Sequence, residues 1–170
     1  MAKNIEYSNQ VPIWKFIFLS VITFGLYEVY WMYKQWKFFK NRNELKVRPF
    51  WRSIFSLFFI HSLFVKVSKF AEDIAYDKKF GENSAGLLAL LYVVLVFLQR
   101  LPDPLWLISM FTFLAFIEPV RVMNFYWNKS QPDLPLKLFR WWEIMLIIPL
   151  ALFAIIAIII MIIGPFLPDI

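Results

Sequence analysis

The carboxylate of Glu28 stands inside a mainly apolar stretch, residues 13–33, where an acid is rare enough to suggest a function. Acids that persist inside membrane helices line ion or proton paths, or they pair with a base. Aromatic residues close to Glu28, such as Tyr30 and Trp31, are typical of a membrane interface. Two roles stay open: the carboxylate lines a conduction path, or it is an interfacial anchor that pairs with Lys34 or another nearby base.

Three further polar side chains suit proton or ion chemistry. His61 is the single histidine, and its imidazole suits a proton relay, a pH sensor or a hydrogen bond to a neighbouring helix. Glu118 and Arg121 are three residues apart, so a helix places them on one side as an ion pair. Such a pair suits a polar gate where a helix leaves the membrane, or a salt-bridged helix end.

A basic run with interleaved aromatic residues follows the first apolar stretch. Its seven bases are Lys34, Lys37, Lys40, Arg42, Lys46, Arg48 and Arg52. In a soluble protein this combination would suggest nucleic acid. Because the run adjoins a membrane helix, we expect contact with anionic lipid headgroups instead, worth about 1 kcal/mol per base. The alternative is that the bases only orient the chain in the membrane.

The sequence offers no catalytic, metal-binding or cofactor-binding motif. It has no cysteine and one histidine, which excludes thiol catalysis, disulfides and a multi-histidine metal site within one chain. Walker A, G-x-S-x-G, H-E-x-x-H and G-x-G-x-x-G patterns are absent. An enzyme acting on lipid would have to use Glu118 and His61, and no reaction follows from that pair. We therefore expect a protein that is not an enzyme and needs no cofactor.

The elements that position these residues are expected to be membrane helices. Hydrophobic residues make up 61% of the 170 residues and the mean hydropathy is +0.61, above the roughly 45–50% apolar content of soluble domains. A chain this apolar suits lipid as its solvent. The predicted fold class is all-α: an integral membrane helical bundle in one domain, residues 1–170, with four transmembrane helices and one interfacial or half-inserted helix.

The predicted spans are residues 13–33, 85–100, 104–120 and 144–163, and the interfacial helix covers residues 50–69. The two middle spans are short and flank the turn residues 99–104, so a re-entrant hairpin over residues 86–117 is an alternative. Small residues recur every three positions in two segments, which allows close helix contact and predicts that the third and fourth spans face each other there. They are Ser109, Thr112 and Ala115, and Ala151, Ala154 and Ala157.

This arrangement divides the 18 Lys and Arg residues unequally. Fifteen lie in segments 34–85 and 118–143, and three, Lys3, Lys15 and Arg100, lie on the other side. Because basic loops stay in the cytoplasm, we expect those two segments inside and both ends of the chain outside. If residues 50–69 also crossed, the split would be eight against ten, and the bias would be lost.

The segment Thr23–Trp31 reads T-F-G-x-Y-x-x-Y-W. It resembles the signature of a bacterial inner-membrane family known only as a domain of unknown function, although Glu28 stands where small residues are common in that signature. The segments R-P-F-W-R-S-I-F-S at 48–56 and E-P-V-R-V-M-N-F-Y-W-N at 118–128 are similar to patterns in small bacterial membrane proteins. The resemblance implies a multi-pass protein of the bacterial inner (plasma) membrane and carries no activity or site residues.

Together these features favour a structural or accessory membrane protein. We expect it to bind anionic membrane lipid, or a partner membrane protein that includes a second copy of itself, and not nucleic acid. The alternative is a subunit of an oligomeric channel or transporter. Several copies would then line a pore, because Glu28 is the one charge that lies more than three residues from either end of a predicted span.

Overall fold

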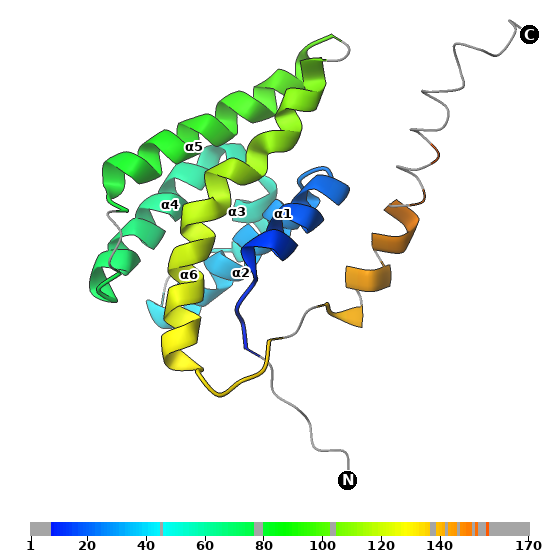
Figure 1. Ribbon diagram of the computed structural model, residues 1–170. Coiled ribbons are helices and arrows are strands. Elements are labelled where there is room, and N and C mark those ends of the chain that lie inside the picture. The colour runs from blue at the N-terminus through cyan, green and yellow to red at the C-terminus, as the bar shows by residue number, and fades with distance from the viewer. Residues whose placement is uncertain are drawn as a thin grey trace, which may run out of the picture. The chain divides into compact units, whose positions relative to one another are not determined.

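The computed structural model of the protein describes residues 8–44, 46–76, 80–102, 105–136, 139–141, 143–145, 147–150, 152 and 156. Within these residues the fold is all-α, as predicted. Residues 1–136 and 137–170 form two separate compact units. The elements of the first unit are α1 (Ile13–Ile22), α2 (Leu26–Arg42), α3 (Pro49–Ile54), α4 (Ser56–Asp73), α5 (Glu82–Phe97), η1 (Leu98–Arg100), η2 (Leu105–Phe116) and α6 (Ile117–Ser130) (Figure 1).

Among the described residues, two helices are long and apolar enough to cross a membrane: Glu82–Arg100, formed by α5 and η1, and Leu105–Ser130, formed by η2 and α6. The first helix packs against η2 of the second, and the two run in opposite directions (Figure 1), so we call them the long hairpin. Only 22% and 44% of their most apolar stretches are buried, whereas the core helix of a soluble protein is mostly buried. Large apolar side chains such as Leu87, Leu90 and Phe111 are exposed, which suits lipid.

The two middle spans predicted from the sequence are short for a membrane crossing, and the two helices of the long hairpin are longer than predicted. The first helix starts at Glu82, before the expected residue 85, so α5 and η1 together extend about 30 Å. The second begins as a 3-10 helix, which rises about 2 Å per residue, so η2 alone extends about 24 Å. In a 3-10 helix every third residue lies on one face, and Ser109, Thr112 and Ala115 form its buried face. These three residues pack within the first unit, where Thr112 contacts Glu28 of α2. Their predicted contact with the fourth span stays a prediction, because its alanines lie outside the described residues.

The continuous helix expected over residues 13–33 is instead two helices, α1 and α2. The chain reverses at Phe24 and Gly25, whose φ angles of 50° and 84° are left-handed and end a right-handed helix. The Thr23 hydroxyl joins the two helices: it donates to the Leu19 carbonyl oxygen at 2.7 Å and accepts the Tyr27 N–H at 2.9 Å. Hydropathy alone did not reveal this break, because a glycine in an apolar stretch leaves the mean hydropathy high.

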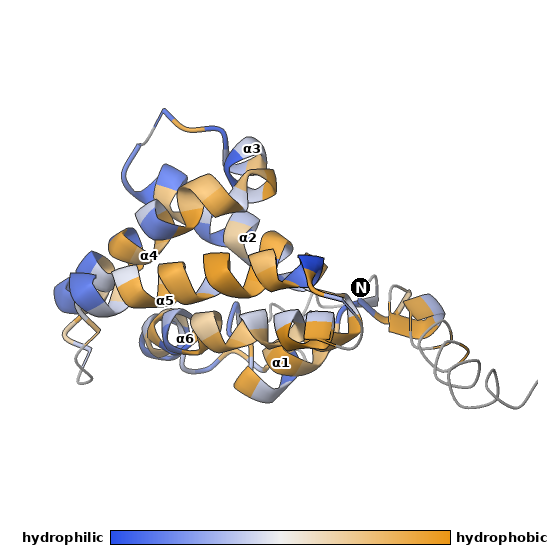
Figure 2. Ribbon diagram, turned by 90° about the horizontal axis from the view of Figure 1, so that it is seen from above, coloured by the Kyte–Doolittle hydropathy of each residue, from blue (hydrophilic) through white to orange (hydrophobic). Residues whose placement is uncertain are grey.

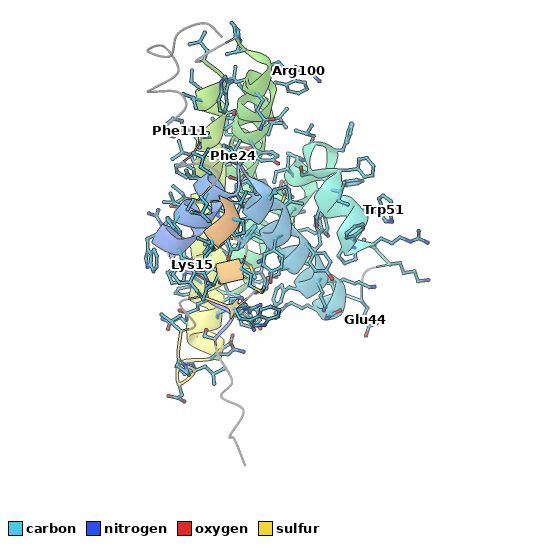
Figure 3. The ribbon with its side chains drawn as sticks, turned by 90° about the vertical axis from the view of Figure 1, so that its right-hand side faces the viewer. Lys15, Phe24, Glu44, Trp51, Arg100 and Phe111 are labelled. Carbon is cyan, nitrogen blue, oxygen red and sulfur yellow. The ribbon has the colours of Figure 1, made fainter. Side chains whose placement is uncertain are left out.

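The start of α1 and the end of α2 both lie beside the C-terminal half of α6. The Asn124 side chain accepts the Val11 N–H at 2.9 Å and donates to the Val11 carbonyl oxygen at 2.7 Å. At the far end of α2, the Phe38 ring lies 5.5 Å from the Trp127 ring. The reversal, by contrast, lies beside Thr112 in η2. Figure 3 shows Phe24 near the level of Phe111 and short of Arg100, so the pair turns back before it reaches the turn of the long hairpin.

The α3–α4 pair also turns back beside the middle of the long hairpin. A break at Phe55 separates the two helices, and the Ser56 hydroxyl then lies 3.1 Å from the Tyr92 hydroxyl in the middle of α5. Near the other end of α4, Lys69 forms an ion pair of 3.0 Å with Glu82 at the start of α5. The predicted half-inserted helix over 50–69 therefore corresponds to α3 and most of α4.

One aromatic side chain joins five of these elements. Phe116 is fully buried at the junction of η2 and α6. Its ring centroid lies 5.3–5.8 Å from four others, which come from α1, α2, α4 and α5: Phe16, Trp31, Phe64 and Tyr92. We call these five rings the aromatic hub. Figure 2 shows the matching pattern of hydropathy, with hydrophobic colour over most of α1 and α5 and hydrophilic colour where α4 ends and α5 begins.

The second unit is described only in part. Residues 141, 143–145 and 147–150 are helical, and the Arg140 N–H donates to the Glu143 carboxylate at 2.7 Å. Most of the predicted span 144–163, with Ala151, Ala154 and Ala157, lies outside the described residues. That span stays a prediction from the sequence.

Replacing Gly25 with alanine should destabilise the protein by about 1–2 kcal/mol, the cost of a left-handed backbone for an L-residue. The added methyl group would itself fit, because its nearest neighbour is Glu28 Oε2 at 3.7 Å. Gly81→Ala is the matched control, since Gly81 has an ordinary φ of −90° and open space around it. Denaturant unfolding in detergent micelles measures both changes. Equal stability of Gly25→Ala and wild type would contradict the left-handed turn.

Candidate functional site

A shallow pocket of about 380 Å³ lies between α2 and α3 and gathers three of the predicted lipid-binding bases. Lys37 and Lys40 are three residues apart and lie on one face of α2, and Arg48 comes from the residue just before α3. The remaining lining residues are Tyr33, Asn41, Pro49, Phe50 and Trp51. Lys34 and Lys46, which were also expected to contact lipid, do not line this basic pocket.

The basic pocket combines exposed charge with exposed aromatic rings. Phe50 and Trp51 are 59% and 50% exposed, and Figure 3 shows Trp51 projecting from the α3 side. Lys37, Lys40 and Arg48 form no ion pair with any acid in the part of the chain that the structure describes. Their charge is therefore available to an anion from outside.

Two of the predicted lipid-binding bases are used inside the protein instead. The Arg42 guanidinium lies 4.9 Å from the centre of the Phe70 ring, and the Arg52 guanidinium lies 4.5 Å from the Trp36 ring. A guanidinium over an aromatic face is held there by cation–π attraction. These contacts fasten α2 to α4 and α3 to α2, so Arg42 and Arg52 position the basic pocket rather than line it.

The structure brings Glu28 to a second site, which its sequence neighbours did not predict. Its side chain is 1% exposed and lies in the first turn of α2. The Thr112 hydroxyl donates to Glu28 Oε1 at 2.9 Å. Within the described residues Glu28 forms no ion pair, so the expected pairing with Lys34 or another base is wrong. The carboxylate turns toward η2 because the chain reverses at Gly25, three residues earlier.

Glu28 lies beside η2, in the half of the long hairpin that is nearer its turn. Thr112 is seven residues past Leu105, or about 14 Å at the rise of a 3-10 helix. This is about a third of the length of the helix Leu105–Ser130, and about half of the roughly 30 Å of a hydrocarbon layer. An α-helix carries partial positive charge at its first turn, so the start of α2 favours a carboxylate there. A charged or hydrogen-bonding group at such a depth marks a functional candidate.

A cavity of about 450 Å³ opens beside Glu28, bounded by the α1–α2 reversal and by the half of the long hairpin that is nearer its turn. Its polar lining residues are Ser20, Glu28, Tyr92, Gln99, Ser109 and Thr112. Its apolar lining includes Phe24, Trp106 and Met110. Sequence reasoning did not assign a site role to Ser20 or Gln99. The signal that was available for Thr112, its spacing from Ser109, pointed to packing.

The other polar candidates lie outside both sites. Glu118 and Arg121 form the ion pair that their spacing predicts, and the Tyr76 hydroxyl donates to Glu118 at 3.4 Å. Burial, together with the negative charge of Glu118, raises the pKa of Tyr76 above its usual value of 10.0, which keeps the hydroxyl protonated as a donor. The contacts among Tyr76, Glu118 and Arg121 hold the residues that follow α4 against α6. His61 is exposed on α4, and its imidazole lies next to Gly86 of α5.

Comparison of the chain with protein-family models, with curated proteins and with solved structures found no match. The function must therefore be argued from the two sites themselves.

Proposed function

We propose that this protein is a multi-pass membrane protein that binds anionic lipid headgroups through the basic pocket. The observation that carries the proposal is the convergence of Lys37, Lys40 and Arg48 beside exposed Phe50 and Trp51. Bases near a membrane surface attract anionic headgroups, and aromatic rings prefer the depth of those headgroups. The pocket offers both at one place, so it suits a phosphate with its acyl chains nearby.

The proposed topology follows from the two short helix pairs. The long hairpin crosses the membrane, and the α1–α2 and α3–α4 pairs enter from the basic side, reach about half depth and return. Residues 9–11 then lie on the same side as the C-terminal half of α6, because they are hydrogen-bonded to Asn124, Asn128 and Gln131. Arg100 becomes the single one of the 18 Lys and Arg residues on the outer side. This sharpens the positive-inside bias and revises the expectation that the start of the chain is outside.

The bacterial inner membrane remains the proposed location, because the T-F-G-x-Y-x-x-Y-W resemblance falls on the α1–α2 reversal. Thr23, Gly25 and Tyr27, which form that turn, are signature positions. Gly25 supplies the left-handed backbone of the turn, and Thr23 supplies its hydrogen bonds. The turn therefore explains why the signature has these residue types at these positions. The channel alternative is less favoured, because Glu28 bonds to Thr112 of its own chain instead of standing free for a pore axis.

Replacing Lys37, Lys40 and Arg48 by glutamine should weaken binding of anionic lipid roughly a hundredfold, at about 1 kcal/mol per base. Binding by wild type should also weaken as salt rises. The control replaces Lys46, Lys66 and Lys129 by glutamine, which removes the same charge outside the pocket. Titration of phosphatidylglycerol into protein held in zwitterionic nanodiscs measures both variants. Equal losses in the two triple variants would leave these bases with a topological role only.

Single cysteines test the topology without background, because the chain has no cysteine of its own. In intact cells, a membrane-impermeant thiol reagent should label Arg100→Cys and spare Asn9→Cys and Lys40→Cys. Permeabilised cells provide the control for accessibility of all three. Labelling of Asn9→Cys in intact cells would restore a crossing helix over residues 13–33 and refute the re-entrant pair.

A further inference from the structure

The cavity beside Glu28 has the size and the walls of a small-molecule site. Its volume of about 450 Å³ lies within the roughly 300–1,000 Å³ of ligand pockets. Most of its lining is apolar or aromatic, with Phe24, Trp106 and Met110 around the polar groups. Gln99, the residue before Arg100, also lines it, so the cavity extends toward the outer end of the long hairpin.

Two polar atoms in this cavity lack partners of their own. The Ser20 hydroxyl is on a residue that is 3% exposed, and it has no hydrogen-bond partner among the described residues. In the same part of the chain, Thr112 is the donor that reaches the Glu28 carboxylate, and it uses Oε1. Oε2 is therefore left to accept a further hydrogen bond. A buried polar atom without a partner costs about 1–3 kcal/mol, so the Ser20 hydroxyl favours a ligand that satisfies it, and Oε2 can accept a hydrogen bond from the same ligand.

The charges of the lining residues determine whether the ligand is a cation or an anion. Glu28 is the one acid among the lining residues, and no Lys or Arg lines the cavity. An anion would be repelled, and a divalent metal ion would require more oxygen ligands of fixed geometry than one carboxylate supplies. An ammonium group carries a positive charge and up to three N–H donors, which match one carboxylate oxygen and a nearby hydroxyl.

We propose that this cavity binds an organic amine: a protonated primary or secondary ammonium group joined to an apolar body. The ammonium donates to Glu28 Oε2 and to the Ser20 hydroxyl. The apolar body packs against the aromatic and aliphatic wall that includes Trp106 and Met110. The ligand enters from the outer half of the membrane, along the side lined by Gln99.

Binding of tritiated 2-phenylethylammonium tests this site in nanodiscs of phosphatidylcholine, which has no net charge to attract the amine. Wild type should bind the probe saturably, and Glu28→Gln should lower the affinity at least tenfold. Glu72→Gln is the matched control, because Glu72 is an exposed acid on α4, and it should bind as wild type does. Unlabelled 2-phenylethanol and 3-phenylpropionate, which keep the ring and lose the cation, should not compete.

Ser20→Ala keeps the test decisive if Glu28→Gln fails to fold. No hydrogen bond among the residues that the structure describes depends on the Ser20 hydroxyl, so this variant should fold normally and bind the amine about threefold to tenfold more weakly. Failure of wild type to bind the amine saturably would overturn the proposal. Undiminished binding by both variants, or equal competition by 2-phenylethanol, would also overturn it, since the cavity would then recognise only apolar surface.

Discussion

A backbone turn inside a membrane finds no water, so its amide and carbonyl groups must be satisfied within the protein. The reversal between α1 and α2 meets this constraint with its own residues. The Gly25 N–H donates to the Ser20 carbonyl oxygen at 2.9 Å, and the Thr23 hydroxyl serves Leu19 and Tyr27 together. The left-handed φ of Gly25 brings these groups into reach. Because the turn satisfies itself, it needs no hydrogen-bond partner from outside, as the proposed reversal at half depth requires.

Both sites follow from this reversal. It places Glu28 at the first turn of α2, facing Thr112 on the long hairpin. It also sends α2 back toward the basic side, where Lys37 and Lys40 meet Arg48. The aromatic hub around Phe116 fixes α1 and α2 against α4, α5 and η2, so the two sites are held by one packed core. A buried carboxylate and a basic pocket thus arise from the same local geometry.

The sequence predicted the all-α class, the two long apolar helices and the buried spacing of Ser109, Thr112 and Ala115, because each rests on local composition or period. The ion pair of Glu118 and Arg121 also depends only on helical spacing. The partner of Glu28 could not be predicted, since Thr112 is 84 residues away in the chain. The reversal at Gly25 was missed for a different reason: hydropathy measures how apolar a segment is and carries no information on its φ angles. Its signal was the Thr-Phe-Gly sequence between two apolar runs.

The depth of the α1–α2 reversal is the central claim of this account, and a spin label measures it most directly. Leu26 begins α2 and is 64% exposed, so a nitroxide on Leu26→Cys should fit without repacking the core. Oxygen gathers in the membrane interior, whereas a polar nickel chelate stays in water, and collision rates with each report depth. We predict that the label collides strongly with oxygen and weakly with nickel, as one on Leu90 in the middle of α5 does. Strong nickel collision, equal to that of a label on Arg100 or Lys40, would place the reversal at a membrane surface and contradict the account.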